Sequence, residues 1–190
     1  WYRPVAVFLG RYGNGKMNKK TNIMNNSYLL TNSNILLENI QNIATSLSPN
    51  TYIIPVLKDN FYGLGDVTAA KIYEPLPFVK CFAVAHLTEA LALRESGIKK
   101  DIFILGNILP FQIQTAVEND ITMTIGRTGL VSEIADICKK SGKTAKIQIK
   151  IDTGLHRIGL EPGSDLDSFV DEFKQNSHWI IVSGRSVCTV

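Results

Sequence analysis

The chain has 190 residues, 45% of them hydrophobic, which is enough for one domain with a substantial core. Its 20 basic and 17 acidic residues leave a net charge of +3, and the lysines are spread along the chain, so nothing indicates a nucleic-acid partner. No apolar stretch approaches the roughly 18 residues needed to cross a bilayer, and no signal-peptide pattern is present. We therefore expect a cytoplasmic protein that binds neither membranes nor nucleic acids.

The cysteines and histidines give no metal-binding pattern. Cys81, Cys138 and Cys188 are far apart in the sequence, and the 3 histidines are scattered. Metal sites usually need such residues at close, regular spacing. We interpret Cys81 and Cys138 as small core residues of a reduced protein, and we expect no metal.

From about residue 32, helical and strand patterns alternate. Asn34 is a candidate N-cap for a first helix, because apolar residues follow it at helical spacing. The further predicted elements, in chain order, are strand 52–57, a short helix from residue 66, strand 81–85, helix 87–96, strand 102–105, a helix from Pro110 to about 119, strand 121–125, helix 129–141, strand 145–151, helix 165–174 and an apolar run at 179–182.

Strands that alternate with helices predict an α/β fold with a parallel sheet. Six strands fit a doubly wound sheet or most of a barrel, and the pattern alone barely separates these architectures. In a barrel, active-site groups lie where strands end, and Lys58, His86, Gly106, Arg127 and Asp152 all follow predicted strands.

The stretch from Val56 to Gly65 is the most informative local feature. An apolar run ends abruptly at Lys58, and a short polar loop with Tyr62 and two glycines follows. A lysine at the end of a buried strand is costly unless its amine has a role or a partner. Schiff-base chemistry with a carbonyl cofactor uses such an amine. The alternative is a strand-end lysine that extends into water.

A second segment, from Lys150 to Gly159, has the same layout. The predicted strand 145–151 runs into a polar loop that carries Asp152, Gly154 and Arg157. We interpret Asp152 as a loop-shaping acceptor for backbone N–H groups. Gly63, Gly65 and Gly154 are expected to permit positive φ angles or close backbone approach.

Together these two motifs resemble the alanine racemases, and Phe82–Ala85 followed by Glu89–Arg94 also reads like that family. The family loop after the lysine reads Ala-Asn-Ala-Tyr-Gly-His-Gly; here Lys58, Asn60, Tyr62, Gly63 and Gly65 match it, while Asp59, Phe61 and Leu64 depart from it. The resemblance extends from about Tyr28 to about Gly184. It implies a parallel (β/α)8 TIM-type barrel that is incomplete here, with about six strands, and without the family's C-terminal β domain.

Two regions of the chain follow from this resemblance. Residues 28–190 are expected to be a partial racemase barrel domain, and residues 1–27 a leader or upstream remnant outside the family pattern. Near the other end, Cys188 stands about where the family has a histidine. We therefore expect an incomplete domain that is itself inactive and that exposes apolar strand edges.

The resemblance also implies a chemistry. The cofactor is pyridoxal 5'-phosphate, which Lys58 would hold covalently while also acting as the catalytic base on one face of the substrate. Tyr62 matches the tyrosine that contacts the cofactor phosphate, Arg157 the arginine at its phenolic oxygen, and Lys150 a supporting lysine, carbamylated in some members, that positions that arginine. The substrate would be alanine, with serine as a substitute, and the second base would be a tyrosine from the other subunit of a homodimer.

From the residues alone, each assignment has a plainer alternative. Tyr62 could pack under its loop, Arg157 could be a surface residue, and Lys150 could simply alternate outwards. A non-catalytic carrier or regulatory barrel that binds pyridoxal phosphate is the main rival function, and a degenerate protein that binds nothing is another. Residues 10–16 resemble a phosphate-binding loop, but Met17 stands where that motif needs a hydroxyl, which argues against a nucleotide hydrolase.

Overall fold

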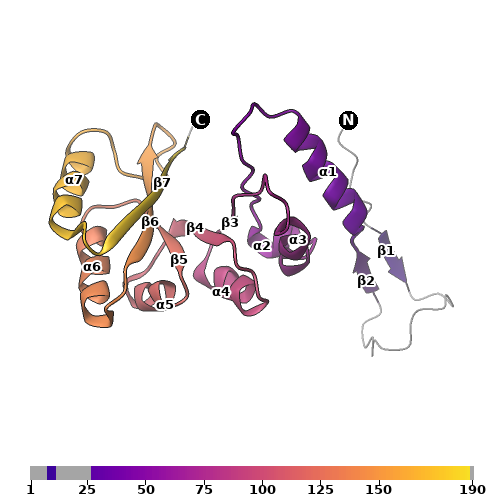
Figure 1. The fold of residues 1–190 in the computed structure, drawn as a ribbon, viewed down its shortest axis with the longest axis horizontal. Coiled ribbons are helices and arrows are strands. Elements are labelled where there is room, and N and C mark those ends of the chain that lie inside the picture. Colours follow the sequence, from indigo (N-terminus) through magenta and orange to yellow (C-terminus); the bar gives the residue numbers. More distant parts are fainter. Residues whose placement is uncertain (1–7, 12–26, 189–190) are drawn as a thin grey trace.

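A computed structural model describes residues 8–11 and 27–188 of the chain. Its centre is a five-stranded parallel sheet in the order β3-β4-β5-β6-β7 (Figure 1). The strands are β3 (Cys81–Val84), β4 (Asp101–Asn107), β5 (Ile121–Ile125), β6 (Ala145–Asp152) and β7 (Ile180–Cys188). The helices are α1 (Ser33–Thr45), α2 (Lys58–Tyr62), α3 (Asp66–Tyr73), α4 (Leu87–Glu95), α5 (Ile113–Glu118), α6 (Leu130–Ser141) and α7 (Ser164–Asn176), with a 3-10 turn, η1 (Pro110–Gln112), before α5.

The sheet is wound in one direction, and its helices cover one face. Each strand pairs with the next strand along the chain, without the reversal of order that a doubly wound sheet requires. The large core cluster joins helix residues to alternate strand residues such as Phe82 and Ile104. On the other face, Cys81, Ala83 and Phe103 form a separate cluster, against which Val56 and Leu105 pack. Leu105 belongs to β4, and Val56 lies in the segment before Lys58. This arrangement is that of a barrel wall with helices outside, so it confirms the barrel implied by the resemblance and excludes the doubly wound sheet, which the hydrophobic pattern alone left open.

The segment before Lys58, residues 52–57, occupies the first strand position of this wall, although it is too irregular to be a full strand. We call each such strand position of the barrel wall a stave. Only Ile53 and Val56 form parallel bridges, to Val79 and Ala83. Pro55 lies between them and has no N–H to donate, which interrupts the ladder that we predicted over 52–57. The N–H of Leu57 still donates to the Ala83 carbonyl at 2.8 Å. With this segment, the described chain contributes six neighbouring staves of an incomplete barrel.

Several predicted boundaries are corrected. The N-cap of α1 is Asn32, whose side chain accepts from the N–H groups of Asn34 and Ile35, so Asn34 lies inside the helix. Pro110 begins the 3-10 turn before α5. β7 is longer than the predicted apolar run and pairs with β6 as far as Asp152 and Cys188. Before α1, a short antiparallel pair, β1 (Phe8–Arg11) and β2 (Ser27–Leu30), is described, whereas Tyr12–Lys16 of the phosphate-loop resemblance lie outside the described residues.

Arg94 and Lys146 fasten the amino ends of the strands. The Arg94 guanidinium donates to the carbonyls of Ile98 and Lys100 before β4, at 3.0 and 2.7 Å, and to those of Asn119 and Asp120 before β5, at 3.2 and 3.0 Å. The Lys146 amine bridges Asp101 and Asp120 at 2.9 and 2.8 Å. In barrels, contacts at the amino ends of the strands serve stability, whereas the loops at the carboxyl ends carry functional groups. Among the described helices, none has the length and apolar character needed to span a membrane.

Candidate active site

Lys58 lies at the carboxyl end of the first wall segment. The residue before it, Leu57, is fully buried, while Lys58 itself is half-buried. The Lys58 amine lies 5.8 Å from the centre of the Tyr62 ring. Tyr62 is 63% exposed, so its ring does not pack under the loop as the plainer alternative required. Tyr62 and part of Lys58 are therefore accessible at the strand end.

The segment labelled α2, which begins at Lys58, is a left-handed helical turn. The local sequence pattern did not predict this conformation. Asp59, Asn60, Phe61 and Tyr62 have φ angles of 54, 53, 51 and 52°. Bonds from the N–H of Phe61 to the Leu57 carbonyl, at 3.0 Å, and from the N–H of Gly63 to the Asp59 carbonyl, at 3.1 Å, give it helical spacing. Each such residue costs about 1–2 kcal/mol in L-amino acids, so other contacts must offset the strain.

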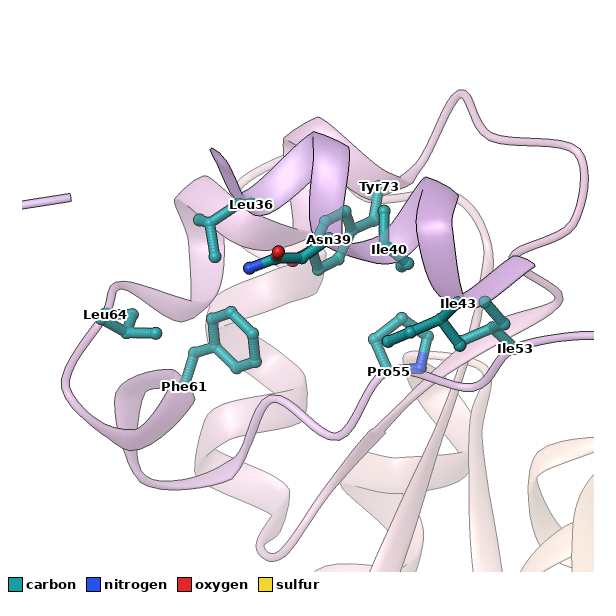
Figure 2. A pocket seen from close by; sticks show the side chains of 9 residues that line it. All are labelled: Leu36, Asn39, Ile40, Ile43, Ile53, Pro55, Phe61, Leu64 and Tyr73. Atoms are coloured by element: carbon teal, nitrogen blue, oxygen red, sulfur yellow. The ribbon is translucent and has the colours of Figure 1, made fainter. Parts of the chain in front are cut away.

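Two of the departures from the family loop contribute such contacts. Phe61 and Leu64 point into an apolar pocket that also involves Leu36 and Ile40 of α1 and Tyr73 of α3 (Figure 2). The Phe61 and Tyr73 rings meet edge to face, with centroids 6.2 Å apart. Burial of these apolar side chains fixes one side of the turn against the helix layer.

Glu89 of α4 supplies a polar contact on the other side of the turn. Its Oε1 accepts from the N–H of Asp59 at 2.7 Å, and its Oε2 accepts from the N–H groups of Ala85 and His86 at 2.8 and 3.0 Å. In the sequence, Glu89 stands out only as part of the family resemblance. Its position three residues after the helix N-cap is a signal for a capping role, but not for the bond to Asp59.

The second motif lies at the carboxyl end of β6. Ile147 and Ile149 face the helices, so Lys150 and Asp152 lie on the inner face by strand alternation. Both are only 7% exposed. The Lys150 side chain is thus mostly buried, and its amine has no hydrogen-bond or ion-pair partner among the described residues.

Asp152 shapes the loop that follows, as we predicted from its position. Its Oδ1 accepts from the N–H groups of Gly154 and His156 at 2.9 and 3.1 Å. These bonds hold the pKa of the Asp152 carboxyl below its ordinary value. The loop returns to its own strand at Gly159, where an added Cβ would lie 2.6 Å from the Asp152 nitrogen. The carboxylate is therefore occupied in loop structure.

Arg157 is carried by this loop and is exposed. Within the described part of the chain, its guanidinium makes no hydrogen bond or ion pair. The structure brings Lys58 together with Tyr62, and Lys150 shares a strand face with Asp152. Among the described residues, no hydrogen bond or ion pair joins Lys58 to Lys150 or Arg157. All four predicted site residues nevertheless lie at the carboxyl ends of staves of one wall, as active-site groups do in barrels.

This geometry defines a segment of a (β/α) barrel with a lysine at the end of its first stave and further cations at the end of a later one. Residues 32–187 match the family described as alanine racemase, N-terminal domain. The chain belongs to this family.

Individual relatives agree with this assignment. The chain is 38% identical over 134 residues to an alanine racemase from Desulforamulus reducens, covering 70% of this chain and 36% of that protein. The solved alanine racemase of Clostridium difficile 630 is 31% identical and superimposes with a TM-score of 0.77, covering 82% of this chain and 40% of that one. A histidine racemase from Leuconostoc mesenteroides is 26% identical, with a TM-score of 0.75, over 83% of this chain and 42% of its own. The chain thus spans well under half of the relatives it matches.

The comparisons confirm the expected architecture. The matched region is the barrel part of the family, and six staves of that barrel are described here. β7 extends to Cys188, which pairs in register with Asp152 at the carboxyl end of the wall.

Proposed function

We propose that the intact protein is a pyridoxal-phosphate-dependent amino-acid racemase that interconverts L- and D-alanine. Membership of the alanine racemase family supports this reaction class. The single observation that carries the proposal for this chain is Lys58, a half-buried amine at a strand end on a strained turn. Strain of this kind is concentrated at functional sites, where it fixes a side chain in position.

The donor set fits pyridoxal phosphate. That molecule carries an aldehyde, a phosphate and a phenolic oxygen, so a site for it needs an amine nucleophile and cationic or hydrogen-bonding donors. Lys58 supplies the amine, and the exposed Tyr62 hydroxyl lies beside it. Arg157 and Lys150 add two cations with no acidic partner within the described residues. Arg157 suits an anionic oxygen because its guanidinium stays charged and presents a planar fork.

In the proposed reaction, pyridoxal phosphate supplies an electron sink for the carbanion formed at the substrate α-carbon. Lys58 would hold the cofactor, and its amine, when free, would take or return the α-proton on one face of the substrate. Tyr62 and Arg157 would orient the cofactor at its phosphate and phenolic oxygens, and Lys150 would support Arg157. Racemisation also needs a base on the opposite face, which the family resemblance assigns to a tyrosine of the other subunit in a homodimer.

The substrate class is part of the proposal. The curated relatives are alanine racemases, which supports alanine. A histidine racemase shares this part of the fold, so the side-chain specificity depends on groups beyond the strand ends described here. A non-catalytic carrier would bind the cofactor equally well, and racemase assays of the intact protein separate it from an enzyme.

Borohydride trapping tests the cofactor site directly. The chain is incubated with pyridoxal phosphate, reduced, digested and mapped by mass spectrometry, with circular dichroism to confirm folding. We expect selective pyridoxyl labelling at Lys58 and its loss in Lys58→Arg, which keeps the charge but cannot form the covalent link. A folded sample that labels Lys58 no more than an exposed lysine such as Lys71 would rule out the proposal.

A further inference from the structure

Glu89 bonds to two different parts of the chain with its two carboxylate oxygens. Oε2 accepts from the N–H groups of Ala85 and His86, which lie just before α4. Oε1 accepts from the N–H of Asp59, 30 residues away in the sequence. The first pair of bonds belongs to the ordinary capping of a helix start. The bond to Asp59 contributes nothing to that cap.

The bond to Asp59 acts on the turn next to Lys58. Before Lys58, the backbone is fixed by the bond from the Leu57 N–H to the Ala83 carbonyl, at 2.8 Å. After Lys58, the first backbone donor is the Asp59 N–H, which Glu89 holds at 2.7 Å. The residues on both sides of Lys58 therefore donate hydrogen bonds from their backbone N–H groups. The acceptors, the Ala83 carbonyl and the Glu89 carboxylate, belong to neighbouring elements, β3 and the start of α4.

We propose that Glu89 is a positioning residue for Lys58, which it fixes by holding the left-handed turn against the start of α4. One carboxylate oxygen caps the start of α4, and the other anchors the turn. A bond to a charged acceptor is stronger than a neutral one, which suits a turn of four successive strained residues. The chemical purpose of this bond, to aim the Lys58 amine, rests on the proposed function.

The substitution Glu89→Gln separates the two jobs. A glutamine has one acceptor oxygen and one NH2 group, so it can satisfy either the Ala85 and His86 donors or the Asp59 donor. Two hydrogen bonds stabilise the side chain more than one, so the glutamine oxygen should accept from Ala85 and His86. Its NH2 group then faces the Asp59 N–H and cannot accept from it. The variant should therefore keep the helix start and lose the bond to Asp59. Glu95→Gln is a matched control, because it removes the same charge from the last residue of the same helix.

Amide hydrogen exchange reads the outcome without cofactor. The informative amides are Phe61, Gly63 and Gly65, which belong to the turn but do not touch Glu89. In Glu89→Gln we expect them to exchange about tenfold faster, as the loss of one bond to a charged group implies, with Ala85 and His86 unchanged. Glu95→Gln should leave all five unchanged. If the three turn amides keep their protection in a folded Glu89→Gln variant, the turn supports itself and the proposal is overturned.

Pyridoxal-phosphate trapping provides a second readout. We expect the fraction of label at Lys58, relative to other lysines, to fall about tenfold in Glu89→Gln, with circular dichroism unchanged. Unchanged selectivity in that variant would overturn the proposal. Failure of the unaltered chain to label at Lys58 would instead count against the proposed function, while the exchange rates would still decide whether Glu89 holds the turn.

Discussion

The turn after Lys58 is supported by distant parts of the chain, whereas the Asp152 carboxylate organises the following loop through hydrogen bonds within its own segment. Phe61 packs on Tyr73 and α1, and the Asp59 N–H bonds to Glu89 of α4. The Asp152 carboxylate bonds to N–H groups two and four residues ahead. One barrel wall thus carries two loops of similar sequence layout, one whose key hydrogen bond comes from a distant helix and one whose aspartate bonds locally.

This difference follows from backbone geometry. Four successive non-glycine residues with positive φ are unstable in isolation, so the first turn needs outside contacts to persist. An aspartate that accepts from nearby N–H groups is a common local turn device and needs none. The loop that bears Lys58 is accordingly the more strained one, and its geometry responds to changes in α1, α3 and α4.

Gly159→Ala should produce the largest effect, because it fills the space that the loop after Asp152 needs where it returns to β6. An added Cβ would lie 2.6 Å from the Asp152 nitrogen, and φ is 148°. We expect the free energy of unfolding to fall by about 3 kcal/mol in urea denaturation. Gly142→Ala is the control, since its φ is 68° but nothing lies within 4 Å, so only about 1 kcal/mol should be lost. Equal losses would mean that close approach to β6 does not matter.

Phe61→Ala tests the dependence of the first turn on the helix layer. Loss of the ring from the pocket under α1 should reduce the free energy of unfolding by about 2 kcal/mol, which is less than for a fully buried phenylalanine. The turn amides should also lose protection from hydrogen exchange. Phe111→Ala provides the contrast, because Phe111 is 78% exposed and should change stability by less than about 0.5 kcal/mol. If the turn amides of Phe61→Ala keep their protection from hydrogen exchange, the turn does not depend on packing against the helix layer.

Acidification should loosen the loop after Asp152. The folded pKa of Asp152 is lowered by the Gly154 and His156 N–H groups, so the stabilisation is fully present above the ordinary aspartate pKa of about 3.9. It is lost as the pH falls below that value and through the lowered folded pKa. Exchange protection of the Gly154 and His156 amides should fall in this range. Asp152→Asn should remove that pH dependence, and its persistence would contradict the assignment.

Much of the site could be predicted from sequence because its key residues interrupt strong local patterns. Lys58 and Asp152 each end an apolar run, and the hydrophobic pattern alone therefore places them at strand ends. The hydrophobic period predicted most of the helices and strands, and the family resemblance selected the barrel. The apolar run over 52–57 does not form a full strand, because Pro55 lacks the N–H that a continuous ladder needs.

The sequence by itself determined which residues stand at the strand ends and that Asp152 would organise its own loop, since both depend on neighbours within a few positions. Only the tertiary structure decided the left-handed turn, the burial of Lys150 on the inner face and the bond from Asp59 to Glu89. These features depend on contacts between segments that are far apart in the sequence. Local propensity disfavours positive φ at Phe61 and Tyr62, and packing against α1, α3 and α4 overrides it.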